Sequence, residues 1–201
     1  MWQKAMNWLH VAVLFIILNF LWIMGTTIGL VIFGAIPSTI AILKLIELPR
    51  IFENDYAYTE FARRYIQNYK EAFRHNKLFL FLPVAVEIIA FFELLMISRF
   101  ELLQAVFQIP IIILMVYNLF VAFHICYLAT QMSKLTLKDY KVVLLSPLIF
   151  KRSTIFGVVT LMALGIIAVF KNWMFLVLFS LGIYVAYLMI NHDYKSHRWI
   201  K

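Results

Sequence analysis

Five long apolar stretches run through the chain, and the segments between them carry most of its charged residues. The first stretch has no charged side chain between Lys4 and Lys44. A helix needs about 20 apolar residues to cross a hydrocarbon core of roughly 30 Å, and it satisfies its own backbone hydrogen bonds there. The pattern predicts an all-α integral membrane protein, a bundle of five transmembrane helices with amphipathic cytoplasmic segments. The predicted spans are 11–33, 78–97, 102–128, 153–170 and 173–190.

The chain then forms a single membrane domain, 1–201, whose cytoplasmic segments are 44–77, 129–152 and 191–201. Lys and Arg residues gather on the cytoplasmic side of membrane proteins. Of the 18 Lys and Arg residues, only Lys4, Arg99 and Lys171 fall on the other side of the five-span arrangement. This asymmetry predicts an N-terminus outside the cell and a C-terminus in the cytoplasm.

Composition supports membrane embedding and changes the interpretation of the net charge. The chain is 64% hydrophobic and 14% charged, whereas soluble domains have about 25% charged residues. A net charge of +8 would suggest a nucleic-acid partner, but these cations flank apolar spans. We therefore expect anionic lipid headgroups as the partner and no nucleic acid. The single cysteine, Cys126, rules out an intrachain disulfide.

An amphipathic helix is predicted within the first cytoplasmic segment. Aromatic residues recur there at every fourth position, and charged residues occupy the other sectors. The residues of this candidate interfacial or partner-docking helix are Phe61, Arg63, Arg64, Tyr65, Tyr69 and Phe73. The aromatic stripe can face lipid, pack on the protein's own helices, or dock a partner. A second, shorter segment of this kind is predicted over 134–151.

Three polar residues within the predicted spans form a candidate intramembrane site. Glu87 lies near the middle of the second span, where a charged carboxylate is costly and needs a partner or a cavity. Asn118 of the third span falls at about the same depth, so the two side chains can form a hydrogen bond. This pair is either a proton or substrate site or a polar clamp between helices. His124 is expected to be a hydrogen-bonded interface residue rather than a metal ligand, because no second ligand stands one turn away.

A candidate helix break or packing motif follows the first span, and its residues are Gly25, Gly29, Gly34, Pro37 and Thr39. Gly25 and Gly29 permit close helix approach. Gly34 and Pro37 permit a break near the cytoplasmic boundary. Ser38 and Thr39 are expected to cap a new helix over 40–48. Such a break can line a substrate site or simply return the chain from the membrane to its surface.

The same segment carries a family resemblance. The run from Gly29 to Ala41, preceded by Asn19-Phe-Leu-Trp22, resembles the start of the YesL-like family, a bacterial domain of unknown function. The aromatic stripe from Phe61 and the segment 137–151 are also similar to that family. The chain departs from the usual pattern at Ser38, where an alanine is common. The resemblance implies a small multi-span protein of the bacterial plasma membrane, often encoded near carbohydrate-uptake systems in Gram-positive bacteria.

These observations lead to a non-enzymatic accessory component associated with carbohydrate uptake or sensing. It would act at its cytoplasmic face on ABC transporter or sensor subunits. The alternative is a small transporter or channel whose pathway includes Glu87 and Asn118. An ABC permease subunit is disfavoured because the loops lack its Glu-Ala-Ala coupling segment. We expect no enzyme activity and no cofactor, because the spans hold too few polar groups to converge on one reacting atom.

Overall fold

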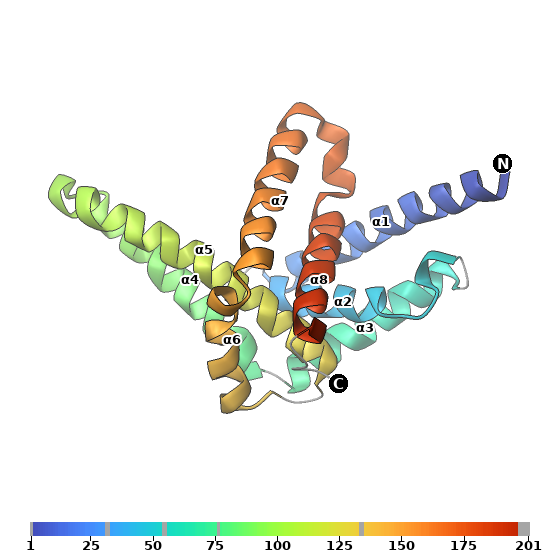
Figure 1. Cartoon of the computed structure of the whole chain (residues 1–201), viewed down its shortest axis with the longest axis horizontal. Helices are drawn as coiled ribbons and strands as arrows, with labels where there is room; N and C mark the ends of the chain where they lie inside the picture. The colour runs from blue at the N-terminus through green and yellow to red at the C-terminus, as the bar shows by residue number, and fades with distance from the viewer. Residues whose placement is uncertain (1, 31–32, 54–55, 76, 133–134, 197–201) are drawn as a thin grey trace.

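A computed structural model describes residues 2–30, 33–53, 56–75, 77–132 and 135–196. Every regular element in these ranges is a helix, which confirms the all-α prediction. The α-helices are α1 (Trp2–Ile28), α2 (Ala35–Ile46), α3 (Tyr58–His75), α4 (Lys77–Ile97), α5 (Glu101–Gln131), α6 (Leu137–Ile149), α7 (Lys151–Phe170) and α8 (Leu178–Ser196). The described 3-10 helices are η1 (Ile51–Glu53) and η2 (Asn172–Leu176) (Figure 1).

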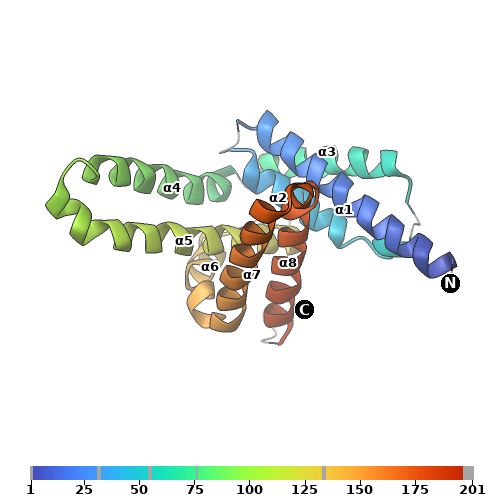
Figure 2. The ribbon, with the colours of Figure 1, turned by 90° about the horizontal axis from the view of Figure 1, so that it is seen from above.

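The helices spread from a common centre in three directions (Figures 1 and 2). Helices α4 and α5 form one antiparallel hairpin. Helices α7 and α8, joined through η2, form a second hairpin that projects at a steep angle to the first. Helix α1 leaves the centre opposite the α4–α5 hairpin, with α2 and α3 beside it. Most side chains on α4, α5 and α7 are therefore free to contact lipid or another membrane protein.

Helix α2 is the centre of the core. It is largely apolar, but its 12 residues are too few to cross a hydrocarbon layer that needs about 20. Ten of them are buried by the surrounding helices, and the wider core joins α1, α2, α3, α5 and α8. Fully buried members of this core include Leu14, Leu18, Ile40, Ile42, Leu45, Phe61, Ile125 and Tyr194. A short apolar helix thus organises the fold from within rather than spanning the membrane.

Among the described residues, four helices, not the predicted five, are long and apolar enough to cross a membrane. Their apolar parts are Met6–Ile28, Leu80–Ile97, Glu101–Gln131 and Lys151–Phe170. The predicted fifth span, 173–190, is wrong as a continuous helix. It is interrupted at Val177, between η2 and α8, where the backbone leaves helical geometry with φ −130° and ψ −4°. Helix α8 then ends in the polar residues His192, Asp193 and Lys195.

The predicted break after the first span is confirmed, but its position differs. Helix α1 ends at Ile28, five residues before the predicted boundary, and Leu30 takes a left-handed φ of 57°. Residues 31 and 32 lie outside the described residues. Helix α2 begins at Ala35, so Ser38 and Thr39 do not cap it as predicted. Gly34 at the N-cap allows the earlier start, and Pro37 fits the first turn, where no helical N–H bond is lost.

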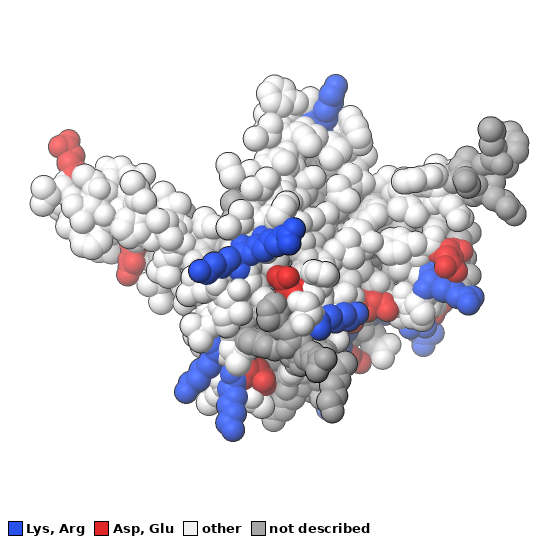
Figure 3. Space-filling model, in the orientation of Figure 1, with Lys and Arg blue, Asp and Glu red and all other residues white. Residues whose placement is uncertain are grey.

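Charged side chains are few on the projecting hairpins, where Figure 3 shows one acidic group at the end of the α4–α5 hairpin and one basic group at the end of the α7–α8 hairpin. Lys and Arg gather over the lower part of the molecule in this view, where α3, α6 and the end of α8 lie. Helix α6 begins here with a capping box, in which Thr136 and Asp139 bond each other's backbone N–H groups. Most of the described part of the segment predicted to be the second cytoplasmic one is therefore helical, whereas residues 133–134 and 197–201 lie outside the described residues.

Candidate functional site

Three glycines make the turn between α1 and α2 possible. A Cβ atom at Gly29 would lie 2.3 Å from the Cα of Gly34, and one at Gly34 would lie 2.5 Å from the carbonyl oxygen of Thr26. Both distances are far below any van der Waals contact and involve backbone atoms. The predicted close approach therefore exists, and it lies within the turn that joins α1 to α2.

Two tyrosines of α3 cover this turn. The Tyr69 hydroxyl donates to the carbonyl oxygen of Gly25 at 3.0 Å. The Tyr65 hydroxyl lies where a side chain at Gly25 would begin, 1.9 Å from that Cβ position. Tyr65 is only 4% exposed, and burial raises the pKa of its hydroxyl to about 12 despite the nearby Ser38 hydroxyl. The glycine turn and the aromatic stripe, predicted as separate motifs, form a single structure.

Thr39 has a packing role inside the same structure. Its hydroxyl donates to the carbonyl oxygen of Ala35 at 2.8 Å and accepts a bond from the indole N–H of Trp22 at 3.0 Å. This pair of bonds ties α2 to α1 one helical turn from the reversal. Thr26 and Ser38, which lie nearby, keep buried hydroxyl oxygens without a hydrogen-bond partner among the described residues.

The aromatic stripe of α3 packs on the protein's own helices, one of the three predicted alternatives. Phe61 and Tyr65 are buried, and Tyr69 and Phe73 are half-buried. Arg64 pairs with Glu60 at 2.6 Å and lies over the ring of Tyr56. The residues of α3 that remain exposed include the cations Arg63, Lys70 and Arg74 together with Gln67, and also Tyr58, Thr59 and Ile66. A partner of this helix therefore meets these exposed residues rather than the aromatic stripe of Phe61, Tyr65, Tyr69 and Phe73.

A large apolar groove runs between α1 and α3. Its volume is about 880 Å³, and its walls include Ile16, Phe20 and Met24 of α1 and Ile66 of α3. Lys70 also lines it, and among the described residues no carboxylate forms an ion pair with Lys70. The groove therefore offers an apolar surface with a cation at its edge.

Glu87 and Asn118 meet as predicted. The Asn118 side-chain amide donates to a carboxylate oxygen of Glu87 at 3.0 Å and to the carbonyl oxygen of Pro83 at 2.8 Å. Both acceptors belong to α4, so the amide joins the two helices of one hairpin. Asn118 is buried and Glu87 is half-buried. The hydrogen bond is confirmed, and its double attachment to α4 favours the polar clamp over a mobile proton site.

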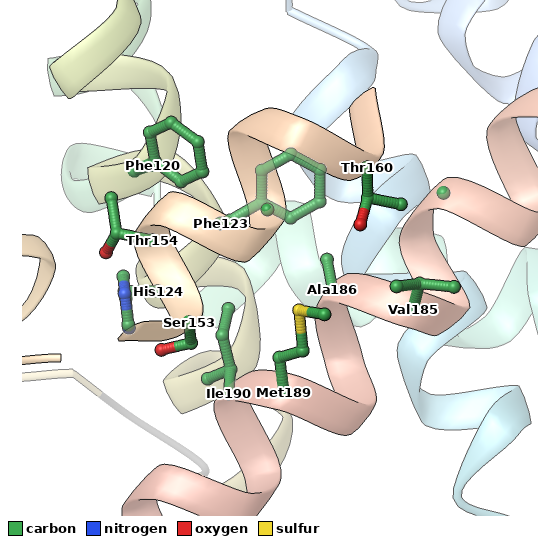
Figure 4. Close-up of a pocket in the computed structure, with 12 residues that line it drawn as sticks. Phe120, Phe123, His124, Ser153, Thr154, Thr160, Val185, Ala186, Met189 and Ile190 are labelled. Carbon is green, nitrogen blue, oxygen red and sulfur yellow. The ribbon is translucent and has the colours of Figure 1, made fainter. Parts of the chain in front are cut away.

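His124 does not join this pair. It lies six residues after Asn118 on α5, about 9 Å along the axis, and faces α7 and α8 instead. Its ring stacks with Phe150 and lies against Tyr194. Beside it is a small cavity of about 20 Å³, which it shares with Ser153 and Thr154 (Figure 4). The Nδ1 atom of His124 has no hydrogen-bond partner among the described residues.

Asn19 was missed as a structural centre by the sequence analysis, which quoted it only as part of a family signature. It is 2% exposed and completes the broken backbone between η2 and α8. Its amide N–H donates to the carbonyl oxygen of Phe175 at 2.9 Å. Its amide oxygen accepts from the backbone N–H groups of Phe179 at 3.0 Å and Ser180 at 3.3 Å. A lone amide in the middle of an apolar span was the signal that could have found it.

Glu47 was missed because an acidic residue after a helix looks unremarkable in sequence. It accepts bonds from the hydroxyl of Thr130 at 3.4 Å and from the side chain of Gln131. Burial raises the pKa of the Glu47 carboxyl, while these bonds and the charge of Lys195 oppose the rise. The carboxyl joins the end of α2 to α5.

The described residues thus define a class: an all-helical protein with four helices long and apolar enough for a membrane. Within those residues, no three His, Cys, Asp or Glu side chains gather in a way that could hold a metal ion. Residues 15–94 match a family described as "Protein of unknown function, DUF624". No curated protein and no solved structure matches the chain.

The matched segment begins within α1 and ends within α4. It contains the glycine turn, the covering tyrosines, Asn19 and Glu87, and it leaves out Asn118 and His124. The similarity noted for 137–151 lies beyond this match and stays a prediction.

Proposed function

We propose that this chain is a non-enzymatic accessory component of the bacterial plasma membrane, of the YesL-like kind, associated with carbohydrate uptake or sensing. Its apolar helices and its match to a family of unknown function support a membrane protein of that kind. The link to carbohydrates depends on the family resemblance alone. The C-terminus, which follows the basic end of α8, lies in the cytoplasm.

The observation that carries the proposal is the construction of α3. Its aromatic residues are fixed against α1 and α2, which makes the helix a rigid platform. Its outward residues Arg63, Gln67, Lys70 and Arg74 remain exposed. A fixed row of cations suits an acidic surface on the cytoplasmic side of a transporter or sensor subunit, because complementary charge steers and orients association.

Crosslinking tests this proposal. A photoreactive amino acid at Gln67 should trap a subunit of a carbohydrate transporter or sensor in growing cells, because this position is exposed between the cations. The same probe at Leu102, which is 81% exposed at the far end of the α4–α5 hairpin, is the matched control and should not trap that subunit. Mass spectrometry identifies the products. Equal products from both positions, or lipid alone from Gln67, would remove the accessory role.

A small transporter is the second candidate, because a carboxyl group lies half-buried in the middle of α4. Under this alternative, Glu87 carries a proton and releases it to a pathway. In reconstituted vesicles, Glu87→Gln should then abolish pH-dependent sugar flux, whereas Glu101→Gln at the exposed hairpin end should leave it unchanged. Absence of flux in the parent protein, or equal flux in the two variants, contradicts transport through Glu87.

A further inference from the structure

We infer that α1 does not cross the bilayer: it lies against the cytoplasmic leaflet together with α2 and α3, and the N-terminus is cytoplasmic. The surface involved is the exposed apolar face of α1, and its partner is an anionic lipid leaflet. This inference is independent of the proposed function. It differs from the prediction made from the sequence, which places the N-terminus outside the cell. That prediction holds only if every long apolar stretch crosses the membrane.

The N-terminal part of α1 contacts the loop before α3. The Nε2 atom of His10 lies 3.4 Å from the carbonyl oxygen of Ile51, and Nδ1 lies 3.3 Å from the hydroxyl of Tyr58. Ile51 stands between Arg50 and Glu53, an ion pair whose side chains are 73% and 63% exposed. Such a pair requires water or headgroups. His10 therefore lies at the depth of the first cytoplasmic segment, not across the membrane from it.

The C-terminal part of α1 contacts the same segment further along. Gly25 receives the hydrogen bond from Tyr69, next to the exposed residues Lys70 and Arg74. The 15 residues from His10 to Gly25 cover about 22 Å of α1. Helix α3 therefore runs parallel to α1 beside most of its length. Both ends of α1 are tied to a single charged helix and the loop before it.

The free energy of placing charged side chains in hydrocarbon decides whether α1 crosses the membrane or lies along its surface. If α1 stood across the membrane, α3 would stand beside it, with Arg63, Lys70 and Arg74 exposed to hydrocarbon. A charged residue costs about 2.5–3.5 kcal/mol near the bilayer centre even on the mildest scale. With both helices along the surface, these cations reach lipid phosphates instead.

The exposed face of α1 fits that position. Ile16, Phe20, Ile23 and Met24 are exposed on the helix side opposite the buried Leu14 and Leu18. They would contact acyl chains, and chains can also enter the 880 Å³ groove between α1 and α3. The length and hydropathy of α1 are equally compatible with crossing the membrane and with lying along its cytoplasmic surface. The contacts with α3 therefore decide between these two positions.

Contacts with α8 independently orient α1. Phe15 packs edge-on against Tyr184, and Trp22 stacks on Phe179. Both partners lie in the first seven residues of α8, so α1 runs antiparallel to that part of α8, ahead of the end that carries Lys195. With α1 removed from the spans, the crossings are α4, α5, α7 and the return through η2 and α8. Both termini are then cytoplasmic, and only Arg99 and Lys171 remain among Lys and Arg on the outer side.

Cysteine labelling tests the inference in the full chain. In a Cys126→Ala background, single cysteines replace Asn7, Gln67 and Lys171, which are all exposed. A membrane-impermeant maleimide should label Lys171→Cys in intact cells, and label Asn7→Cys and Gln67→Cys only after permeabilisation. Labelling of Asn7→Cys in intact cells would overturn the inference.

Fusions to the unsubstituted chain settle the case in which Asn7→Cys is labelled under neither condition. Green fluorescent protein, which fluoresces only when folded in the cytosol, should be bright at the N-terminus. Alkaline phosphatase at the same position, which is active only outside the cytoplasm, should be inactive. The opposite pair of results would show that α1 crosses the bilayer.

Discussion

Gly34→Ala is expected to destabilise the protein by at least about 3 kcal/mol, at or beyond the upper end of ordinary overpacking. The backbone dihedral angles of Gly34, φ −87° and ψ −27°, suit alanine, so the cost comes from space alone. The added Cβ would lie 2.5 Å from the carbonyl oxygen of Thr26 and 2.6 Å from that of Gly25. Relief requires the α1–α2 turn to open. Thermal unfolding in detergent, followed by circular dichroism, measures the loss.

Gly165→Ala is the matched control. Gly165 lies inside α7, and no atom outside its own helix stands within 4 Å of a Cβ placed there. Alanine is favoured over glycine in a helix interior by roughly 0.5–1 kcal/mol, so this variant should be slightly more stable. Equal stability of the two variants would contradict the close packing of the turn.

Asn19→Leu is expected to cost roughly 3 kcal/mol or more, because each buried polar group that loses its partner costs about 1–3 kcal/mol. The substitution keeps a similar size but removes the amide that bonds the backbone of Phe175, Phe179 and Ser180. These groups lie at the break between η2 and α8, where no helical partner replaces the amide. The melting temperature in detergent should fall, and protease cleavage near the break should become faster.

Asn7→Leu provides the comparison on the same helix. Asn7 is exposed, and exposed substitutions usually change stability by less than about 0.5 kcal/mol. A melting temperature for Asn19→Leu as high as that for Asn7→Leu would show that the amide does not hold the break together.

Local information in the sequence was enough for the α4–α5 hairpin. The predicted spans 78–97 and 102–128 lie within α4 and α5, and the bond between Glu87 and Asn118 follows from equal depth on two helices joined by a short turn. Regular helix rise fixes depth from residue number, so a hairpin with a short connection can be aligned without tertiary knowledge.

The sequence could not predict features that depend on distant contacts. The break before α8 exists because Asn19 supplies bonds from far along the chain, so hydropathy alone favours an unbroken span. The glycine motif was found, yet its neighbours Tyr65 and Tyr69 come from another helix. A period of four residues identifies an apolar face, but it does not say whether lipid or protein covers that face.

The contact between Asn19 and Phe175 joins residues 156 positions apart. A ribosome releases α1 long before it has made the segment whose backbone Asn19 completes. Until that segment is made, the Asn19 amide must bond to water or to other groups. The last hairpin can complete its structure only by docking onto the first helix. Folding of this protein therefore ends when the last-synthesised part of the chain docks onto the first-synthesised part.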